Sequence, residues 1–236
     1  MSTLNVIGEF LENWEQPGLN AAARELAVAL ASTAPRGCAS ALLLANNSEA
    51  PHIDHPKSRV ELMPLHTSML PVLWRGNPAA RPLDGEFVHS LSPLVPLRRR
   101  DADDGSQTSV TVQHTLAWDA PEVLPKGQAK TLRALVRRAL KYADVIVTPT
   151  HVVAERLREI YGDALPVQVV PLAAPTEYQA GPDAPLRRGT YNLPDRYMLT
   201  NAYPGEVGRL EWILRAMETH PDLPPLVIIG PAATAD

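Results

Sequence analysis

The sequence predicts an α/β fold built on a doubly wound, mainly parallel β-sheet, followed by an incomplete second βαβ unit. Short apolar or β-branched runs alternate with amphipathic stretches along the whole chain, which is the pattern of βαβ units. The run Cys38–Ala45 is almost entirely apolar, as expected for a strand that is buried on both faces. The 24 prolines among the 236 residues are spread between these stretches, which indicates many short connections rather than a disordered tract.

The elements of the first domain follow in order along the chain. Strands are expected at Leu4–Phe10, Cys38–Ala45, Val60–Met63, Gly85–His89, Ser109–Gln113, Val145–Thr148 and Val167–Val170. Helices are expected at Ala21–Ser32, Ser68–Arg75, Thr131–Tyr142 and Val152–Tyr161. Asn20 and Thr150 are suitable N-caps for two of these helices, and Gly162 is a suitable end for the last one. Parallel strands with helical crossovers place ligands at the carboxyl ends of the strands.

The chain is expected to divide into two domains of unequal completeness. Residues 1–175 form the first domain, and residues 176–190 form a polar linker that contains proline and glycine. Residues 191–236 hold a strand at Tyr197–Ala202, a helix at Val207–Met217 and a strand at Leu226–Ile229. A single βαβ unit of this size cannot bury a core of its own. We therefore expect a truncated two-domain protein, and no activity from this chain alone.

Composition and charge exclude several classes of protein. The net charge of −4, from 22 basic and 26 acidic residues, argues against an electrostatic nucleic-acid binder. No apolar run approaches the roughly 20 residues of a membrane span, and Met1–Glu15 lacks the basic region of a signal peptide. A single cysteine, Cys38, rules out an internal disulfide and a zinc site built from cysteines. A cytoplasmic location is expected.

Polar residues that directly follow strands are the candidates for binding or catalysis. Gly18, between the first strand and helix, would let backbone approach a phosphate, or it serves an ordinary turn. His89 and Ser90 follow one strand, and His114 and Thr115 follow the next. An imidazole there can donate to a sugar hydroxyl or a leaving phosphate, or it is simply a hydrogen-bonded histidine at a strand end.

Two further features have simpler explanations. Thr148 and Thr150 flank Pro149 at the end of a strand; a threonine here can contact a ligand, but the capping role explains Thr150. Arg98–Arg100 and the basic side of the helix Thr131–Tyr142 could touch acidic lipid. A solvated helix face is favoured for this basic side, because acidic residues outnumber basic ones in the chain.

Four segments together resemble motifs of bacterial GT-B glycosyltransferases, the nucleotide-sugar-dependent group that includes α-mannosyltransferases and sucrose-synthase-like enzymes. His89–Pro96 is similar to their H-x-T-x-x-x-x-P loop, and Thr111–Thr115 to their V-T-V-H-D segment. Ala143–Thr150 resembles A-D-x-V-V-x-x-S-x-x-T, and Val169–Ala173 resembles V-x-V-V-P-L-G-V. The order and spacing agree from Leu4 to about Pro175, and more weakly to Pro231.

The resemblance implies two Rossmann-like domains with the active site in the cleft between them. It places Gly18 near the donor diphosphate and His114 near the transferred sugar as the catalytic residue. Ser90 and Thr148 would line the acceptor side, and His89 and Thr115 would also bind substrate. It implies a nucleotide-sugar donor, a glycan or lipid acceptor, and neither a cofactor nor a metal, because helix termini and basic side chains neutralise the diphosphate.

The sequence also departs from the family pattern. Thr115 stands where the family has an acidic partner for the histidine, and the first loop keeps one glycine. In the segment whose cations grip the diphosphate, only Arg209 is basic, so the diphosphate would be held more weakly. The late pair of glutamates has no counterpart.

Two functions remain in competition. The first is transfer of a hexose to a cell-envelope or polysaccharide acceptor, retaining by family analogy and placed in the cytoplasm or at the inner face of the membrane. The second is a non-catalytic assembly partner of another transferase, with a protein partner or a homodimer. An unrelated nucleotide-binding protein is less favoured, because no glycine cluster for phosphate is present.

Overall fold

The computed structural model describes residues 2–9, 16–75, 87–97, 99, 104–174, 180–202, 204–205 and 208–230. The chain separates into two compact units, Met1–Pro175 and Thr176–Asp236, which we call unit 1 and unit 2. Arg98, Arg100 and Val207, which belong to features expected from the sequence, lie outside the described residues.

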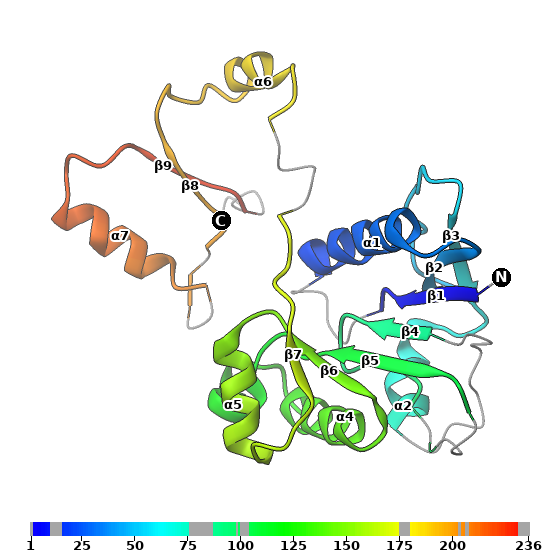
Figure 1. Cartoon of the computed structure of the whole chain (residues 1–236). Coiled ribbons are helices and arrows are strands. Elements are labelled where there is room, and N and C mark those ends of the chain that lie inside the picture. Colours follow the sequence, from blue (N-terminus) through cyan, green and yellow to red (C-terminus); the bar gives the residue numbers. More distant parts are fainter. Residues whose placement is uncertain are drawn as a thin grey trace. The chain divides into compact units, whose positions relative to one another are not determined.

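Unit 1 is organised around a parallel sheet (Figure 1). Its strands are β1 (Ser2–Ile7), β2 (Cys38–Ala45), β3 (Ser58–Met63), β4 (Phe87–Ser90), β5 (Gln107–Thr111), β6 (Val145–Thr148) and β7 (Val167–Val169). They lie in the order β3-β2-β1-β4-β5-β6-β7, and every neighbouring pair is parallel. This arrangement confirms the predicted doubly wound, Rossmann-like α/β fold.

The helices of unit 1 cover the two faces of this sheet. They are α1 (Gln16–Thr33), α2 (Leu70–Arg75), α3 (Leu116–Asp119), α4 (Gln128–Tyr142) and α5 (His151–Tyr161), with 3₁₀ turns η1 (Thr67–Met69) and η2 (Pro121–Val123). On one face, α1 packs its apolar stripe against β1 and β2. On the other face, α2, α4 and α5 enclose the larger core, and Figure 1 shows α1 on the side of the sheet opposite to α2 and α4.

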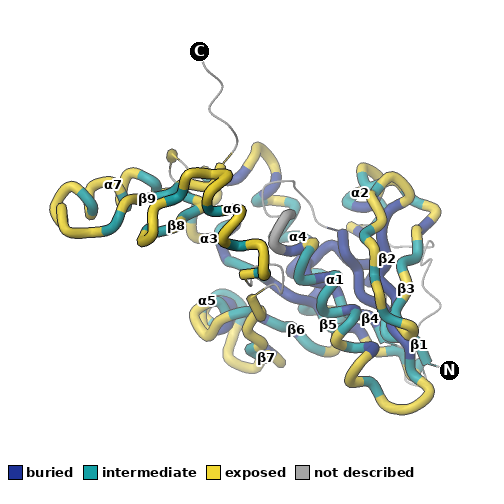
Figure 2. Tube along the Cα trace, turned by 90° about the horizontal axis from the view of Figure 1, so that it is seen from above, coloured by how far each residue is buried: buried dark blue, intermediate teal, exposed yellow. Residues whose placement is uncertain are grey.

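The central strands carry the core because they are covered on both faces. All but the first residue of β2 are buried, and β1 is buried over its last three residues. Gly8, directly after β1, allows this close packing: a Cβ at this position would lie 2.8 Å from Leu44 Cδ2. In Figure 2 the buried chain follows these central strands, whereas the edge strand β3 is largely exposed or intermediate.

Unit 2 contains the predicted βαβ motif and one further helix. Its elements are α6 (Ala184–Thr190), β8 (Met198–Thr200), α7 (Leu210–Thr219) and β9 (Leu226–Ile228), with β8 and β9 parallel. None of the residues described in unit 2 is buried, and Figure 2 draws this unit in teal and yellow. This agrees with the expectation that a lone βαβ motif cannot enclose a core.

Several boundaries differ from those expected. Helix α1 begins at Gln16 rather than Ala21, so Asn20 lies within the helix and is not its cap; Pro17 fits because proline is tolerated in a first helical turn. Strand β5 ends at Thr111, which leaves Gln113 in the following loop. Helix α6 occupies part of the expected linker, where Asp183 and Arg187 form an (i, i+4) ion pair that supports a helix.

None of the helices in the described parts of the chain combines the length and the apolar character that a membrane span requires.

Candidate active site at the carboxyl edge of the sheet

The strand order reverses between β1 and β4, which makes this pair the topological switch point of unit 1. From β1 the chain proceeds to β2 and β3 on one side, and from β4 to β5, β6 and β7 on the other. The connections on the two sides therefore diverge beyond the carboxyl ends of these strands, which is the usual place for a ligand in sheets of this kind. The segments that directly follow β1, β4 and β5 lie at this edge of the sheet.

Glu9 joins the segments at this edge of the sheet, and sequence reasoning missed it. Its side chain is buried, yet Oε1 accepts hydrogen bonds from the Ala45 backbone N–H and the Ser48 hydroxyl, each at 2.7 Å. Its Oε2 accepts a longer bond of 3.5 Å from the Thr67 hydroxyl. One carboxylate thus ties the ends of β1, β2 and β3 together. The available signal was an acidic residue directly after an apolar strand.

The loops after β4 and β5 are joined to the same edge. The Ser92 hydroxyl donates to the Glu9 carbonyl at 3.0 Å, and Gln113 Nε2 donates to the Leu91 carbonyl at 2.9 Å. Ser90, a predicted acceptor-side residue, is fully buried, and its hydroxyl donates to the Leu94 carbonyl at 3.3 Å. Ser90 therefore stabilises the loop after β4 through a buried hydrogen bond.

His114 is half-buried at the carboxyl edge of the sheet, in the segment between the end of β5 at Thr111 and the start of α3. Its Nδ1 accepts a hydrogen bond of 3.3 Å from the Leu116 backbone N–H, at the start of α3. Since Nδ1 is an acceptor, a neutral imidazole carries its proton on Nε2. The structure therefore presents His114 Nε2 as a hydrogen-bond donor, which suits a sugar hydroxyl or a developing negative charge.

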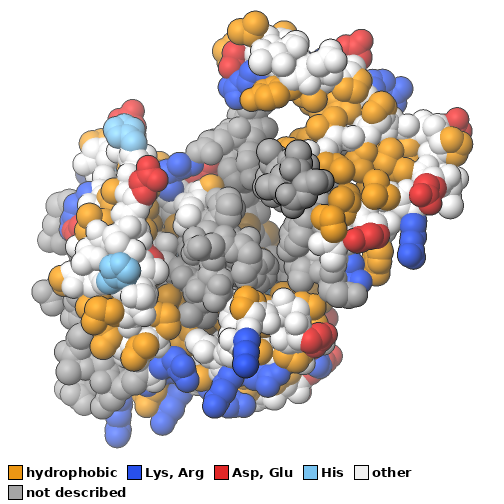
Figure 3. Space-filling view, turned by 180° about the vertical axis from the view of Figure 1, so that it is seen from behind, with side chains coloured by type: hydrophobic (Ala, Val, Ile, Leu, Met, Phe, Trp, Pro, Cys, Tyr) orange, Lys and Arg blue, Asp and Glu red, His pale blue; other side chains and the backbone are white. Residues whose placement is uncertain are grey.

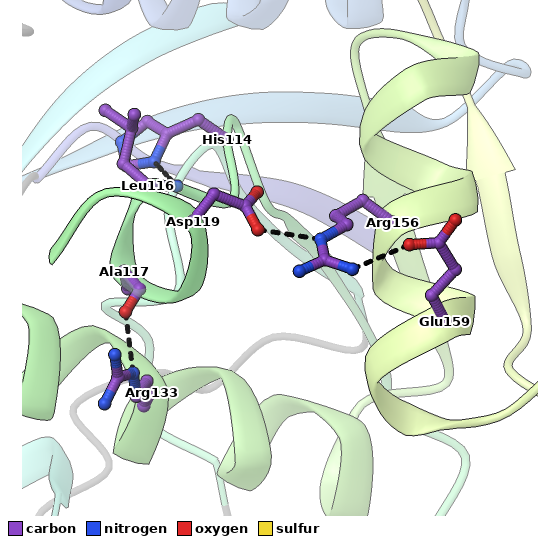
Figure 4. A network of polar contacts seen from close by, with 7 residues as sticks. All are labelled: His114, Leu116, Ala117, Asp119, Arg133, Arg156 and Glu159. Carbon is purple, nitrogen blue, oxygen red and sulfur yellow. Dashed lines mark hydrogen bonds and ion pairs between the residues drawn. The ribbon is translucent and has the colours of Figure 1, made fainter.

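A polar network holds the short helix that follows His114 (Figure 4). Asp119, at the end of α3, accepts a 2.7 Å bond from Arg156 Nε on α5, and Arg156 also reaches Glu159 at 2.7 Å. From α4, Arg133 donates to the Ala117 carbonyl at 2.7 Å. Helix α3 is thereby anchored to both neighbouring helices.

The same network sets the ionisation of Asp119. Burial alone would raise the pKa of this carboxyl group, but hydrogen bonds from Thr115 and Arg156, with the charge of Arg156, outweigh it and lower the pKa. Thr115 stands where the family motif has an acidic residue, and its side chain is hydrogen-bonded to Asp119 one turn later. An acidic residue thus lies close in the chain to His114, although not at the position that the motif predicts.

His89 occupies a different environment. Its ring lies among the strands, where Nδ1 is 2.7 Å from the Ser109 hydroxyl and Nε2 is 3.3 Å from the Thr111 hydroxyl, both on β5. Burial lowers its pKa from 6.5 to about 4, so the imidazole is neutral near pH 7. With both ring nitrogens engaged by β5, this geometry is that of a histidine that bridges two strands.

Thr148 is the last residue of β6, whereas Thr115 lies four residues beyond the end of β5. Thr148 is fully buried, and its hydroxyl donates to the Thr150 carbonyl at 3.3 Å. Thr150 is the N-cap of α5, with its hydroxyl accepting from the Val153 N–H at 3.3 Å, which confirms its predicted capping role. Thr115 is buried before α3.

The two residues predicted to bind the donor diphosphate lie in different units. Gly18 is in the first turn of α1 rather than in a loop before it. Arg209 precedes α7 in unit 2 with a left-handed backbone (φ 53°), and its guanidinium lies over the Trp212 ring, 4.9 Å from the centroid. Within unit 1, Ser90 ends β4 and Thr148 ends β6, the two strands that flank β5, while His114 and Thr115 lie in the segment between β5 and α3.

In the part of the chain that the structure describes, no three His, Cys, Asp or Glu side chains gather in a way that could hold a metal ion.

Comparisons with known proteins place the chain in a family. Residues 17–173, well over half of the chain, match the model of the glycosyl transferase 4-like domain. No curated protein matches the sequence. Among solved structures, UGT2 of Phytolacca americana, complexed with UDP-2-fluoro-glucose and pterostilbene, is similar with a TM-score of 0.48 and 11% sequence identity, covering 98% of this chain and 72% of that one. On the strength of the domain match, this chain belongs to the glycosyl transferase 4-like domain family.

Proposed function

We propose that the chain is part of a nucleotide-sugar-dependent glycosyltransferase of the GT-B type, mannosyltransferase-like, with unit 1 on the acceptor side. It would transfer a hexose from a nucleoside diphosphate sugar to a cell-envelope or polysaccharide acceptor, with retention of the anomeric configuration. The family match supports glycosyl transfer. The choice of a hexose, the class of acceptor and the retention of configuration rest on the motif resemblance alone.

The observation that carries this proposal is the geometry of His114. Its Nδ1 is held by the Leu116 N–H, and it follows a strand next to the switch point. The Nε2–H can then donate a hydrogen bond to a hydroxyl of the transferred sugar, or to the diphosphate oxygen on which negative charge develops as the sugar–phosphate bond breaks. Thr115 and the Ser90 loop would border the acceptor.

On the donor side, Arg209 is the residue assigned to the diphosphate. Guanidinium groups bind phosphate oxygens in a bidentate manner, and Arg209 stands at the N-terminus of α7, where the helix dipole also favours an anion. Gly18, in the first turn of α1, would provide backbone N–H contacts at a second helix N-terminus.

One observation favours the second candidate, a non-catalytic partner of another transferase. The Gly205 N–H, near the start of α7, donates to Glu211 Oε1 at 3.0 Å. The hydrogen bonds from the Glu211 backbone and from Gly205 lower the pKa of Glu211, so the carboxylate is charged at neutral pH. A negative charge beside Arg209 competes with a diphosphate for the same N–H and cation.

Release of nucleoside diphosphate distinguishes the two candidates. UDP and GDP release is measured from UDP-glucose and GDP-mannose with glycan and polyprenyl-phosphate acceptors, for the longer protein of which this chain is a part, as wild type and as His114→Ala. His52→Ala, an exposed histidine in the loop between β2 and β3, is the matched control. Transfer predicts release that His114→Ala lowers by about 100-fold or more and that His52→Ala leaves unchanged.

Two results would contradict these assignments. Equal release by wild type and His114→Ala contradicts the assignment of His114. Absence of release, together with no calorimetric binding of either nucleotide sugar at millimolar concentration, contradicts transfer and supports the non-catalytic partner.

A further inference from the structure

Gln113 directly precedes His114, at the point where the chain leaves the sheet. Beyond the end of β5, the Val112 N–H still donates to the Val147 carbonyl on β6 at 2.8 Å. The half-buried side chain of Gln113 then donates from Nε2 to the Leu91 carbonyl at 2.9 Å. The motif that this segment resembles has a valine here, and a valine side chain has no group to make this bond. The bond is therefore not implied by the motif.

The orientation of the Gln113 amide is fixed by its partner. A carbonyl oxygen only accepts hydrogen bonds, so the group that faces Leu91 is the NH₂ and not the oxygen of the side chain. The bond has the usual length of an N–H···O contact. A glutamate at this position would keep the shape of the side chain but would place an oxygen against the Leu91 carbonyl. Gln113→Glu therefore removes the bond at nearly unchanged volume.

The loop that receives this bond is held from several other directions. Residues 90–97, from the last residue of β4 onward, are all buried. The Ser92 hydroxyl donates to the Glu9 carbonyl at 3.0 Å, and Arg138 on α4 donates to the Leu97 carbonyl. A buried segment whose polar groups are bonded within the protein opens rarely. The loop after β4 is thus a rigid support for the segment that Gln113 joins to it.

His114 is held between two anchors. On its N-terminal side is the bond of Gln113 to this loop. On its C-terminal side the Leu116 N–H donates to its Nδ1 at 3.3 Å, as Figure 4 shows, and α3 is tied to α4 and α5 through Arg133 and Asp119. A bond of 3.3 Å is long and therefore weak. The direction of the imidazole consequently depends on the Gln113 anchor as well as on α3.

We infer that Gln113 is a positioning residue: it fixes the backbone at His114 against the loop after β4 and thereby keeps the direction of Nε2 constant. Its importance for the reaction rests on the proposed function, in which His114 acts on the transferred sugar. A displacement of about 1 Å in a catalytic group can lower a rate on the order of 100-fold. Because Gln113 acts through His114, its loss lowers the rate of transfer and leaves the binding of the nucleotide sugar unchanged.

NMR of the full chain tests the positioning without any substrate. At about pH 8 the imidazole is neutral, and long-range ¹H–¹⁵N spectra should show His114 as a single Nε2–H tautomer, because Nδ1 accepts from Leu116. Gln113→Leu and Gln113→Glu should bring in the Nδ1–H tautomer and speed hydrogen exchange of the Leu116 N–H at least about tenfold. Gln168→Leu, at an exposed position on β7, is the matched control and should leave both unchanged.

The other histidines separate a local effect from a general loss of structure. His52, His66 and His151 are exposed, and Figure 3 shows histidine side chains at the surface of unit 1; their signals should be the same in every variant. The ring of His89 bridges β4 and β5, so its signal changes if the sheet itself is disturbed. The positioning role predicts a change in His114 with His89 unaffected. If Gln113→Leu disturbs His89, the nearly isosteric Gln113→Glu decides the test.

Kinetics of the longer protein of which this chain is a part test the consequence for transfer. Gln113→Leu should lower kcat for release of nucleoside diphosphate at least about tenfold, while KM for the nucleotide sugar stays within about twofold. In the His114→Ala background the same change should have no further effect, because it acts through the imidazole. A loss that persists in this background would mean that Gln113 contacts the substrate itself, which overturns the positioning role.

The two experiments distinguish a failed positioning role from a failed proposed function. Absence of release by the longer wild-type protein contradicts the proposed function, and the NMR spectra then still decide whether Gln113 positions His114. If release depends on His114 but the tautomer and the Leu116 exchange rate are unchanged in both Gln113 variants, the positioning role is overturned. An unchanged kcat in Gln113→Leu overturns it as well.

Discussion

Asp119 Oδ1 lies 2.7 Å from Arg156 Nε, and this ion pair joins the end of α3 to α5. Helix α3 begins directly after His114 and Thr115, so the position of the histidine depends on how this short helix is held. Four residues cannot form a stable helix by themselves. Its contacts with α5 and α4 therefore fix the segment that presents the imidazole.

Replacing Arg156 by alanine is expected to lower the melting temperature slightly at neutral pH, since both partners are partly exposed. The pKa of Asp119 is lowered in the folded state from its ordinary 3.8. The pair therefore contributes stability above that pH and loses it as the pH falls through the lower, folded-state value. Melting temperatures from pH 7 to pH 3 should converge for wild type and Arg156→Ala. A difference in melting temperature that stays constant down to pH 3, or that Lys57→Ala shows as well, contradicts this role.

Glu9 is expected to be the most sensitive position at the edge of the sheet. Glu9→Ala removes the acceptor of the Ala45 N–H and the Ser48 hydroxyl, leaving buried donors unsatisfied at a cost of about 2–4 kcal/mol. Glu9→Gln keeps one acceptor oxygen and should cost less. Urea unfolding measures both, with Glu49→Ala, at an exposed position in the loop after β2, as control. A change of less than about 0.5 kcal/mol in Glu9→Ala contradicts the proposed role.

His89 should make the stability of unit 1 depend on pH. Its pKa is about 4 in the folded chain against an ordinary 6.5, so the unfolded chain binds more protons between these values. The free energy of unfolding therefore falls as the pH drops from 6.5 to 4, by about 3 kcal/mol in total. His89→Gln does not titrate and should lack this part of the decline, whereas His52→Gln should retain it. Parallel curves of unfolding free energy against pH for wild type and His89→Gln would refute this prediction.

The alternation of apolar runs with amphipathic stretches was sufficient to predict the sheet. A strand that is buried on both faces of a sheet requires an apolar run, and such a run is visible in the sequence. The strand Cys38–Ala45 has the bounds that the pattern indicates, following Gly37 with its positive φ of 87°. Helix α5 likewise lies between the cap Thr150 and Gly162. Local signals were decisive here because cap and strand residues act on their immediate neighbours.

The candidate site was less predictable, because its contacts join residues far apart in the chain. Sequence places Glu9 after a strand, but only the fold brings Ala45, Ser48 and Thr67 to its carboxylate. The strand-end position of His89 left open whether it faces a ligand or another strand, and its two hydroxyl partners on β5 depend on the register. The early start of α1 at Gln16 was indicated by Pro17, which favours a first helical turn.

The response of the His114 ring to a nucleotide sugar shows whether the donor sugar binds at the carboxyl edge of the sheet. Ring ¹H–¹⁵N signals of the histidines are recorded by NMR during titration with UDP-glucose or GDP-mannose, and the His114 signal is identified by its absence in His114→Ala. We expect the His114 Nε2–H signal to shift in a saturable manner while the signals of His89 and His52 stay in place. A His114 signal that does not change at saturating nucleotide sugar would contradict the claim that this edge of the sheet is where the donor sugar reacts.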